Sequence, residues 1–138
     1  MALIVDAGPL YASLNRSDPD HARCRSLLDT FSELLVVPAP VLVEVEYLAR
    51  TRMHVGISVA FLGDVIRGVF EVEELGMPDY RRIREVCEQY SESAIGLVDA
   101  AVLAVAERLN ESKVAALDHR HFRMLRPRHV DALQLLPE

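Results

Sequence analysis

The feature that most constrains the fold of this chain is a short aliphatic run near its start, Leu3-Ile4-Val5, which ends at Asp6. Because its apolar residues do not alternate with polar ones, the run predicts a strand buried on both faces, as in a parallel sheet covered by helices. Gly8 and Pro9 then favour a turn into a helix. Ligands of open α/β sheets bind in a crevice at the carboxyl ends of the strands, so we expect Asp6 to stand at the functional edge.

Strand and helix patterns alternate along the rest of the chain. We predict further strands over 34–37, 69–75, 113–117 and 132–136, and helices over 10–14, 17–32, 40–50, 56–70, 77–91, 96–109 and 121–125. This alternation predicts a three-layer α/β/α sandwich with a mostly parallel central sheet. The strand over 69–75 alternates apolar and acidic residues, which suits an edge position. A length of 138 residues predicts one domain spanning 1–138.

Three of the predicted helices carry informative apolar patterns. The helix over 96–109 is apolar almost all round and is predicted to be buried. The helix over 56–70 repeats apolar residues at helical spacing, among them Val59, Leu62 and Ile66. The helix over 77–91 is charged and amphipathic. Its expected inward residues are Tyr80, Ile83, Val86, Cys87 and Tyr90.

Composition and charge exclude several classes of protein. A hydrophobic fraction of 51% with 26% charged residues is typical of a globular protein, and no apolar run reaches the length of a membrane span. The first twenty residues do not resemble a signal peptide, so we expect a cytoplasmic protein. Cys24 and Cys87 lack metal-binding spacing and are expected to be free thiols. A net charge of -6 argues against a surface that binds nucleic acid by bulk positive charge.

Four acidic residues stand at positions that need explaining. Asp6 and Asp118 each follow a predicted strand, and either could simply cap the next helix. Asp99 lies in the first turn of the most apolar helix, where desolvation opposes a charge. Glu44 and Glu46 point roughly 200° apart on a helix. Arg50 pairs with Glu46 at i,i+4 spacing, which accounts for Glu46, whereas Glu44 shares its face with apolar residues.

Together these positions indicate one acidic pocket. Two acids at strand ends and two in first helical turns would all face the crevice of a doubly wound fold. Carboxylates gathered there repel one another, and without a cation at least one should take up a proton. Mg²⁺ or Mn²⁺, which prefer oxygen ligands, would resolve the repulsion. Such a site commonly acts on phosphates.

Four segments, in order and covering essentially the whole chain, resemble the PIN-domain ribonucleases of the VapC toxin type. They are Val5-Asp6-Ala7-Gly8-Pro9-Leu10, Pro40-x-x-x-Glu44-Val45, Gly96-Leu97-Val98-Asp99-Ala100 and Leu117-Asp118-x-x-x-Phe122. Many members of this family carry a hydroxyl residue after the first aspartate and two residues before the last one. This chain has Ala7-Gly8 and Ala116 there.

The resemblance implies a metal-dependent endoribonuclease, the toxin half of a toxin–antitoxin pair. It implies that Asp6, Glu44, Asp99 and Asp118 hold Mg²⁺ or Mn²⁺ and carry the catalysis, leaving a 5′-phosphate and a 3′-hydroxyl on a structured RNA such as a transfer or ribosomal RNA. It also implies a homodimer, and a VapB-type antitoxin whose C-terminal segment covers the groove and often places a basic side chain among the acids.

One dense basic stretch follows the last acid. Arg120, Arg123, Arg126 and Arg128 stand there with His119 and His121. They could hold RNA phosphates or form a solvated turn, and both interpretations remain open.

Three other functions are alternatives to the nuclease. A phosphoreceiver domain would need a lysine at the end of a late strand, whereas Lys113 stands at the beginning of its strand. A haloacid-dehalogenase-like phosphatase would need a second aspartate at position 8, which is Gly8. A catalytically inactive module that keeps the fold for binding or dimerisation remains the alternative.

Overall fold

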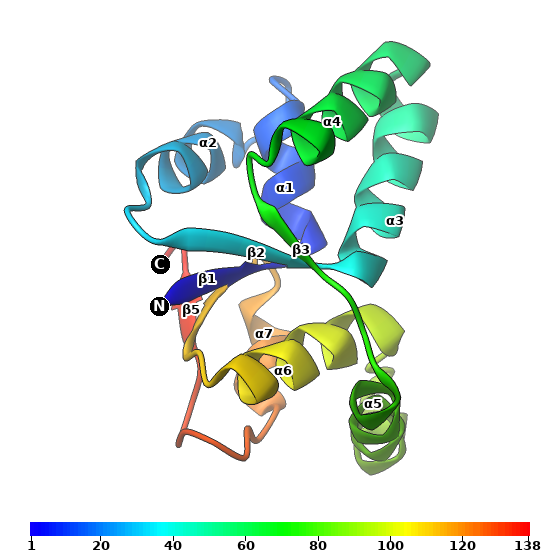
Figure 1. Ribbon diagram of the computed structural model, residues 1–138, viewed down its shortest axis with the longest axis vertical. Helices are drawn as coiled ribbons and strands as arrows, with labels where there is room; N and C mark the ends of the chain where they lie inside the picture. The colour runs from blue at the N-terminus through cyan, green and yellow to red at the C-terminus, as the bar shows by residue number, and fades with distance from the viewer.

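The computed structural model describes residues 1–138 as a central sheet between two layers of helices (Figure 1). All strand pairings are parallel, in the order β3-β2-β1-β4-β5. The strands are β1 (Ala2–Val5), β2 (Leu34–Pro38), β3 (Glu71–Glu73), β4 (Lys113–Ala115) and β5 (Gln134–Leu136). The predicted three-layer α/β/α sandwich is confirmed, and β3 lies at an edge as expected.

The helices divide between the two faces of the sheet. Figure 1 shows α1 to α4 on one face and α5 to α7 on the other. They are α1 (Ala7–Leu14), α2 (His21–Thr30), α3 (Ala39–Leu48), α4 (Val55–Arg67), α5 (Met77–Gln89), α6 (Leu97–Leu109) and α7 (His119–Met124). The π-helical turn η1 (Ala49–Met53) joins α3 to α4, and the 3₁₀ turn η2 (Ser91–Ser93) follows α5. No helix is long and apolar enough to cross a membrane.

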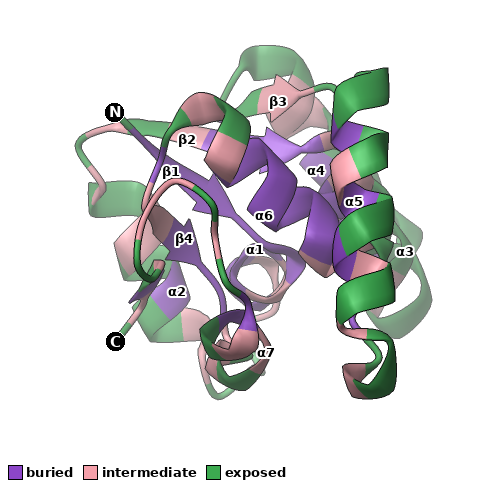
Figure 2. Cartoon of the chain, turned by 90° about the horizontal axis from the view of Figure 1, so that it is seen from below, coloured by how far each residue is buried: buried purple, intermediate pink, exposed green.

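Strand β1 lies at the centre of the hydrophobic core. Leu3, Ile4 and Val5 are completely buried, because β2 and β4 flank the strand and helices cover both faces. The prediction from the uninterrupted aliphatic run is therefore confirmed. Helix α6 is also buried over most of its length, from Ala100 to Ala106, as its all-round apolar sequence predicts (Figure 2).

The strand order places a topological switch point between β1 and β4. From β1 the chain moves outward in one direction to β2 and β3, and it then returns to β4 on the other side of β1. Neighbouring connections at such a point leave the sheet on opposite faces, and they open a crevice at the carboxyl ends of the strands. Asp6 follows β1 and Asp118 follows β4 closely, so both predicted acids reach this crevice.

One prediction about a helix face is wrong. Tyr80 of α5 is 44% exposed, although Ile83 and Val86 are buried as predicted. Helix α4 forms as its apolar spacing predicts, and the residues that show this spacing are exposed: Val59, Leu62 and Ile66 face the solvent. The buried residues of α4 are Ser58 and Phe61. The two cysteines are free thiols, as expected.

The burial of α6 predicts that its side chains contribute strongly to the free energy of unfolding. Replacing Leu103, which is completely buried, with alanine removes apolar contacts and leaves a cavity. We expect Leu103→Ala to lower the free energy of unfolding by about 2–5 kcal/mol in urea titrations. Ile66→Ala, at a position 85% exposed, should change it by less than about 0.5 kcal/mol. Equal losses in the two variants would contradict this assignment of the core.

Candidate active site

Asp6 is the most buried acid of the switch point. Its backbone N–H donates to the carbonyl of Ala115 over 2.9 Å, which fixes the residue beside the end of β4. The residue is only 9% exposed, and its Oδ1 atom has no hydrogen-bond partner. Although Asp6 precedes α1, its side chain makes no capping hydrogen bond there. The simpler interpretation, that Asp6 caps α1, therefore does not explain why its carboxylate is buried.

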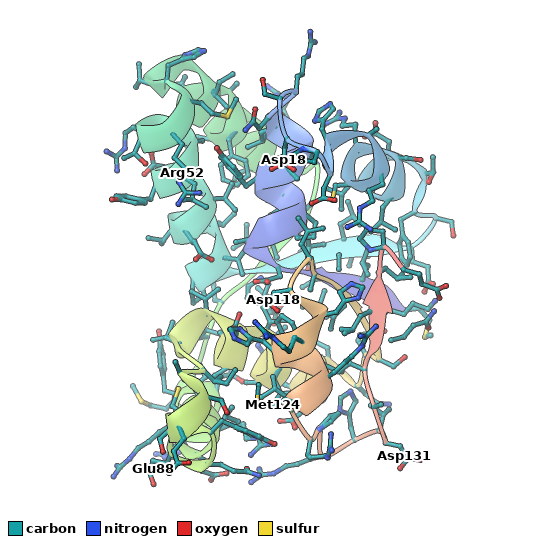
Figure 3. The ribbon with its side chains drawn as sticks, turned by 180° about the vertical axis from the view of Figure 1, so that it is seen from behind. Asp18, Arg52, Glu88, Asp118, Met124 and Asp131 are labelled. Atoms are coloured by element: carbon teal, nitrogen blue, oxygen red, sulfur yellow. The ribbon has the colours of Figure 1, made fainter.

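Asp118 approaches the same edge from β4. Gly8 of α1 permits this approach, because a side-chain carbon added there would lie 3.3 Å from Cβ of Leu117. The Asp118 side chain is 53% exposed, and its Oδ1 accepts the backbone N–H of His121 as the cap of α7. Figure 3 shows Asp118 near the middle of this face of the molecule, at the start of α7. The capping role that the sequence left open is thus observed for Asp118.

Asp99 lies in the first turn of α6, which begins directly after Gly96. Its side chain is 24% exposed, and its Oδ2 atom lies 3.3 Å from Nδ1 of His121. The same nitrogen lies 3.3 Å from Oδ2 of Asp118. A single imidazole therefore contacts two acids that are brought together from α6 and from the start of α7.

Glu44 reaches the cluster from α3, but it is not buried as its apolar neighbours in the sequence suggested. The residue is exposed, because its face of α3 borders a groove and is not covered by the sheet. The prediction for Glu46 is confirmed: Arg50 donates to it over 2.9 Å, and Ser58 donates to it over 2.7 Å. Only Glu44 of these two glutamates is directed toward the acidic crevice.

The carboxylates act on one another electrostatically. Burial raises the pKa of Asp6 from 3.8 to about 7, an effect that the nearby Ala7 backbone N–H partly offsets. The charges of the other three acids, in the order Asp99, Glu44 and Asp118, contribute to the same rise. The four predicted acids are therefore close enough to share one electrostatic field, and at neutral pH Asp6 is protonated in a large fraction of molecules.

The pKa values of Glu44 and Asp99 are raised as well. Desolvation, followed by the charge of Asp99, raises the pKa of Glu44. Desolvation also raises the pKa of Asp99, while His121 opposes that rise. Since each additional negative charge makes ionisation of the others harder, full ionisation of this cluster requires a compensating cation.

A divalent cation fits this donor set. The unpartnered Oδ1 of Asp6 is a buried oxygen that a bound cation would satisfy. Carboxylate oxygens are the ligands that Mg²⁺ and Mn²⁺ prefer. As placed, no three His, Cys, Asp or Glu side chains are close enough together to enclose an ion. The exposed acids, Glu44 and Asp118, would therefore have to turn inward around the fixed Asp6.

The sequence predicted four acids for this site and placed His121 only in the basic stretch that follows them. The signal that could have found it is its spacing, three residues after Asp118, which places the two side chains on the same face of a helical turn. It is also the only basic side chain within 4 Å of any of the four acids. The site therefore contains one nitrogen donor in addition to the carboxylates.

An apolar groove of about 590 Å³ adjoins the acids. It lies between α3, α5 and the start of α6, and Glu44 is the only one of the four acids on its wall. Val43, Tyr47, Tyr80 and Leu97 supply exposed apolar surface there. A ligand in this groove would contact apolar side chains and one edge of the acidic cluster at the same time.

In the basic stretch after Asp118, one arginine forms an ion pair with an acid of the fold and the others do not. Arg128 pairs with Glu85, and its backbone N–H donates to Glu107 over 2.8 Å. Arg120 and Arg123 are exposed and form no ion pair. Only the unpaired arginines are available to bind phosphate.

The position of Lys113 argues against a phosphoreceiver site. Its Nζ lies 2.8 Å from Oε1 of Glu33, at the amino end of β4, away from the acidic crevice. The prediction that this lysine stands at the wrong end of its strand is confirmed.

Comparison with known proteins identifies the family. Residues 3–126 match the model of the PIN domain. Ribonuclease VapC26 of Mycobacterium tuberculosis is 32% identical over 125 residues, which cover 91% of this chain and 93% of the relative.

Solved structures match the fold across most of the chain. VapC20 of Mycobacterium tuberculosis, described as a sarcin–ricin loop cleaving toxin, matches with a TM-score of 0.79 and 22% identity, covering 84% of this chain and 89% of that one. VapBC2 from Rickettsia felis, bound to a DNA fragment from its promoter, matches with a TM-score of 0.70 and 14% identity, covering 98% of each chain. At these identities the likeness establishes the fold.

The raised pKa of Asp6 predicts an unusual pH dependence of stability. Because the folded state holds its proton up to about pH 7 and the unfolded state only up to about pH 4, stability without metal should fall as the pH rises between them. Asp6→Asn should remove most of this loss and be more stable than the wild type at pH 8 by up to about 4 kcal/mol. Urea titrations in chelator at several pH values measure the difference.

The matched control is Asp131→Asn, since Asp131 is exposed and lies far from Asp118 in Figure 3. It should keep the pH dependence of the wild type. If Asp6→Asn keeps that dependence too, the Asp6 carboxylate is not desolvated as described.

Proposed function

The chain belongs to the VapC group of the PIN-domain family, and from this premise we propose that it is a Mg²⁺- or Mn²⁺-dependent endoribonuclease, the toxin of a toxin–antitoxin pair. The proposed domain spans residues 1–138. The proposed substrate is a structured RNA, such as a transfer or ribosomal RNA, which would place the protein in the cytoplasm.

The observation that carries the proposal is the buried, unpartnered Oδ1 of Asp6, a residue whose pKa the charges of three further carboxylates raise. A fold gains nothing in stability by burying one carboxyl oxygen without a partner beside other acids. Such an arrangement persists where a bound cation offsets its cost. Asp6, Glu44, Asp99 and Asp118 are therefore the proposed metal ligands and catalytic residues.

The acids have different parts in the proposed chemistry. When bound, Mg²⁺ or Mn²⁺ lowers the pKa of water and offsets the charge on phosphoryl oxygens. Asp6, fixed by its backbone and by burial, defines the inner wall of the site. Asp99 lies beside it in the first turn of α6, where its charge faces the positive end of the helix dipole. The exposed Glu44 and Asp118 can adjust when a phosphodiester enters.

The unpaired arginines of α7 support RNA as the polyanion. Arg120 and Arg123 lie directly after Asp118 on α7 and have no acidic partner, so their guanidinium groups can contact phosphates beside the scissile bond. With a net charge of -6, the rest of the molecule does not attract nucleic acid. Binding would therefore be local to the site and sensitive to salt.

Exposed apolar surface supports protein partners. Val55, Val59, Leu62 and Ile66 form a stripe along α4, at a spacing that keeps all four side chains on one face of the helix. The groove beside Glu44 adds Tyr47 and further apolar side chains. A second copy of the chain and a VapB-type antitoxin are the proposed partners that would cover these surfaces. The acid at the edge of the groove suits a basic antitoxin side chain.

We expect the purified chain, freed of antitoxin, to cleave a structured RNA in Mg²⁺ or Mn²⁺ and not in excess chelator. Asp99→Asn should lower the cleavage rate about 100-fold or more, because several kcal/mol of charge stabilisation depend on this ligand set. End-labelled RNA separated on gels measures the rate and maps the ends, which should be 5′-phosphate and 3′-hydroxyl.

Asp131→Asn serves as the control, because it removes the same charge at an exposed position far from the cluster. It should cleave at the wild-type rate. Equal cleavage with and without chelator would refute the metal dependence. Unchanged toxicity and RNA processing in both Asp6→Asn and Asp99→Asn would favour an inactive binding or dimerisation module.

The apolar stripe of α4 also predicts self-association. Its four exposed side chains would gain free energy by leaving water, and a closed dimer is the simplest assembly that achieves this. Light scattering of the purified protein at micromolar concentration should give the mass of two chains. A monomeric mass would contradict the proposed homodimer while leaving the antitoxin proposal intact.

A further inference from the structure

His121 is the basic side chain that meets the acidic cluster. Its Nδ1 lies 3.3 Å from Oδ2 of Asp99 and 3.3 Å from Oδ2 of Asp118. No other lysine, arginine or histidine lies within 4 Å of Asp6, Glu44, Asp99 or Asp118, although this part of the chain is rich in arginine. The fold has therefore placed one particular nitrogen between two of the acids.

The two acids differ in how firmly the rest of the structure holds them. Asp99 is mostly buried at the start of α6, whereas Asp118 is 53% exposed and could otherwise adopt several side-chain conformations. Residue 121 restrains Asp118 twice: its backbone N–H donates to Oδ1, and its imidazole contacts Oδ2. With the proton on Nδ1, the imidazole can donate to both carboxylates and so couple α7 to α6.

We propose that His121 is a positioning residue, which holds the carboxylates of Asp99 and Asp118 in the orientation that binds a divalent cation. The inference rests on the proposed metal-dependent function and deepens it. The contact engages Oδ2 of Asp99 and restrains the rotation of its carboxylate. Side chains that orient metal ligands in this way typically contribute 10- to 100-fold to metal affinity.

Two other roles for His121 make different predictions. A surface ion pair that only stabilises the first turn of α7 would contribute to folding and leave metal affinity unchanged. An imidazole that occupies the place of the cation would compete with it, so its removal would tighten metal binding. The positioning role alone predicts weaker binding in a protein that remains folded.

The test is a calorimetric titration of the purified, RNA-free chain with Mn²⁺ at one fixed pH. His121→Ala should weaken Mn²⁺ binding about 10-fold or more. His121→Asn should bind within about threefold of the wild type, because the asparagine amide nitrogen can take the place of Nδ1. His121→Gln, whose amide nitrogen reaches the place of Nε2, should bind as weakly as His121→Ala. Thermal unfolding in chelator establishes that each variant is folded.

His119→Ala is the matched control, because His119 lies on the same helix and has no acid within 4 Å. It should bind Mn²⁺ like the wild type. Unchanged or tighter binding by His121→Ala would overturn the positioning role, as would binding by His121→Asn that is no stronger than that of His121→Ala. A wild-type chain that binds no Mn²⁺ would overturn the proposed function as well, so the two failures are distinguishable.

Discussion

The burial of one carboxylate at the end of the central strand is the constraint on which the arrangement of the site depends. The backbone N–H of Asp6 donates to Ala115, which holds the residue at the end of the sheet, and the carboxylate is buried there. Burial is therefore the largest contribution to its raised pKa, and the like charges around it add to the effect. The hydrophobic core that stabilises β1 is thus also the cause of the chemistry at its end.

The four acids differ in how firmly the structure holds their side chains. Asp6 is held by the sheet, Asp99 by the start of a buried helix, and the other two lie on exposed surface. Such a difference suits a site that must keep its ligand geometry and still admit a long polymer. His121 stands where fixed and adjustable acids meet, and this explains why one contact there can influence the whole cluster.

Much of the fold could be predicted because it follows from local patterns. The aliphatic runs of β1 and α6 can be stable only inside a core, and their burial was predicted correctly. The exposed stripe of α4 shows the limit of such patterns, because periodicity reveals that a helix has an apolar face and not what covers that face. Glu44 shows the same limit: its neighbours in the sequence suggested burial, whereas the tertiary structure leaves that face beside a groove. His121 contacts Asp99 across two helices, a pairing that only the folded chain defines.

The pairing of β1 with β4 has a consequence for the newly made protein. Strand β1 precedes the other elements of the sheet in the sequence, yet one of its two neighbours, β4, and the helix that covers its second face, α6, are translated only after α5. A nascent chain that has reached only α4 can cover one face of β1, and it still lacks Asp99 and Asp118. The four acids can therefore come together only after the chain has been made at least as far as Asp118, so the pocket is among the last features of the fold to form.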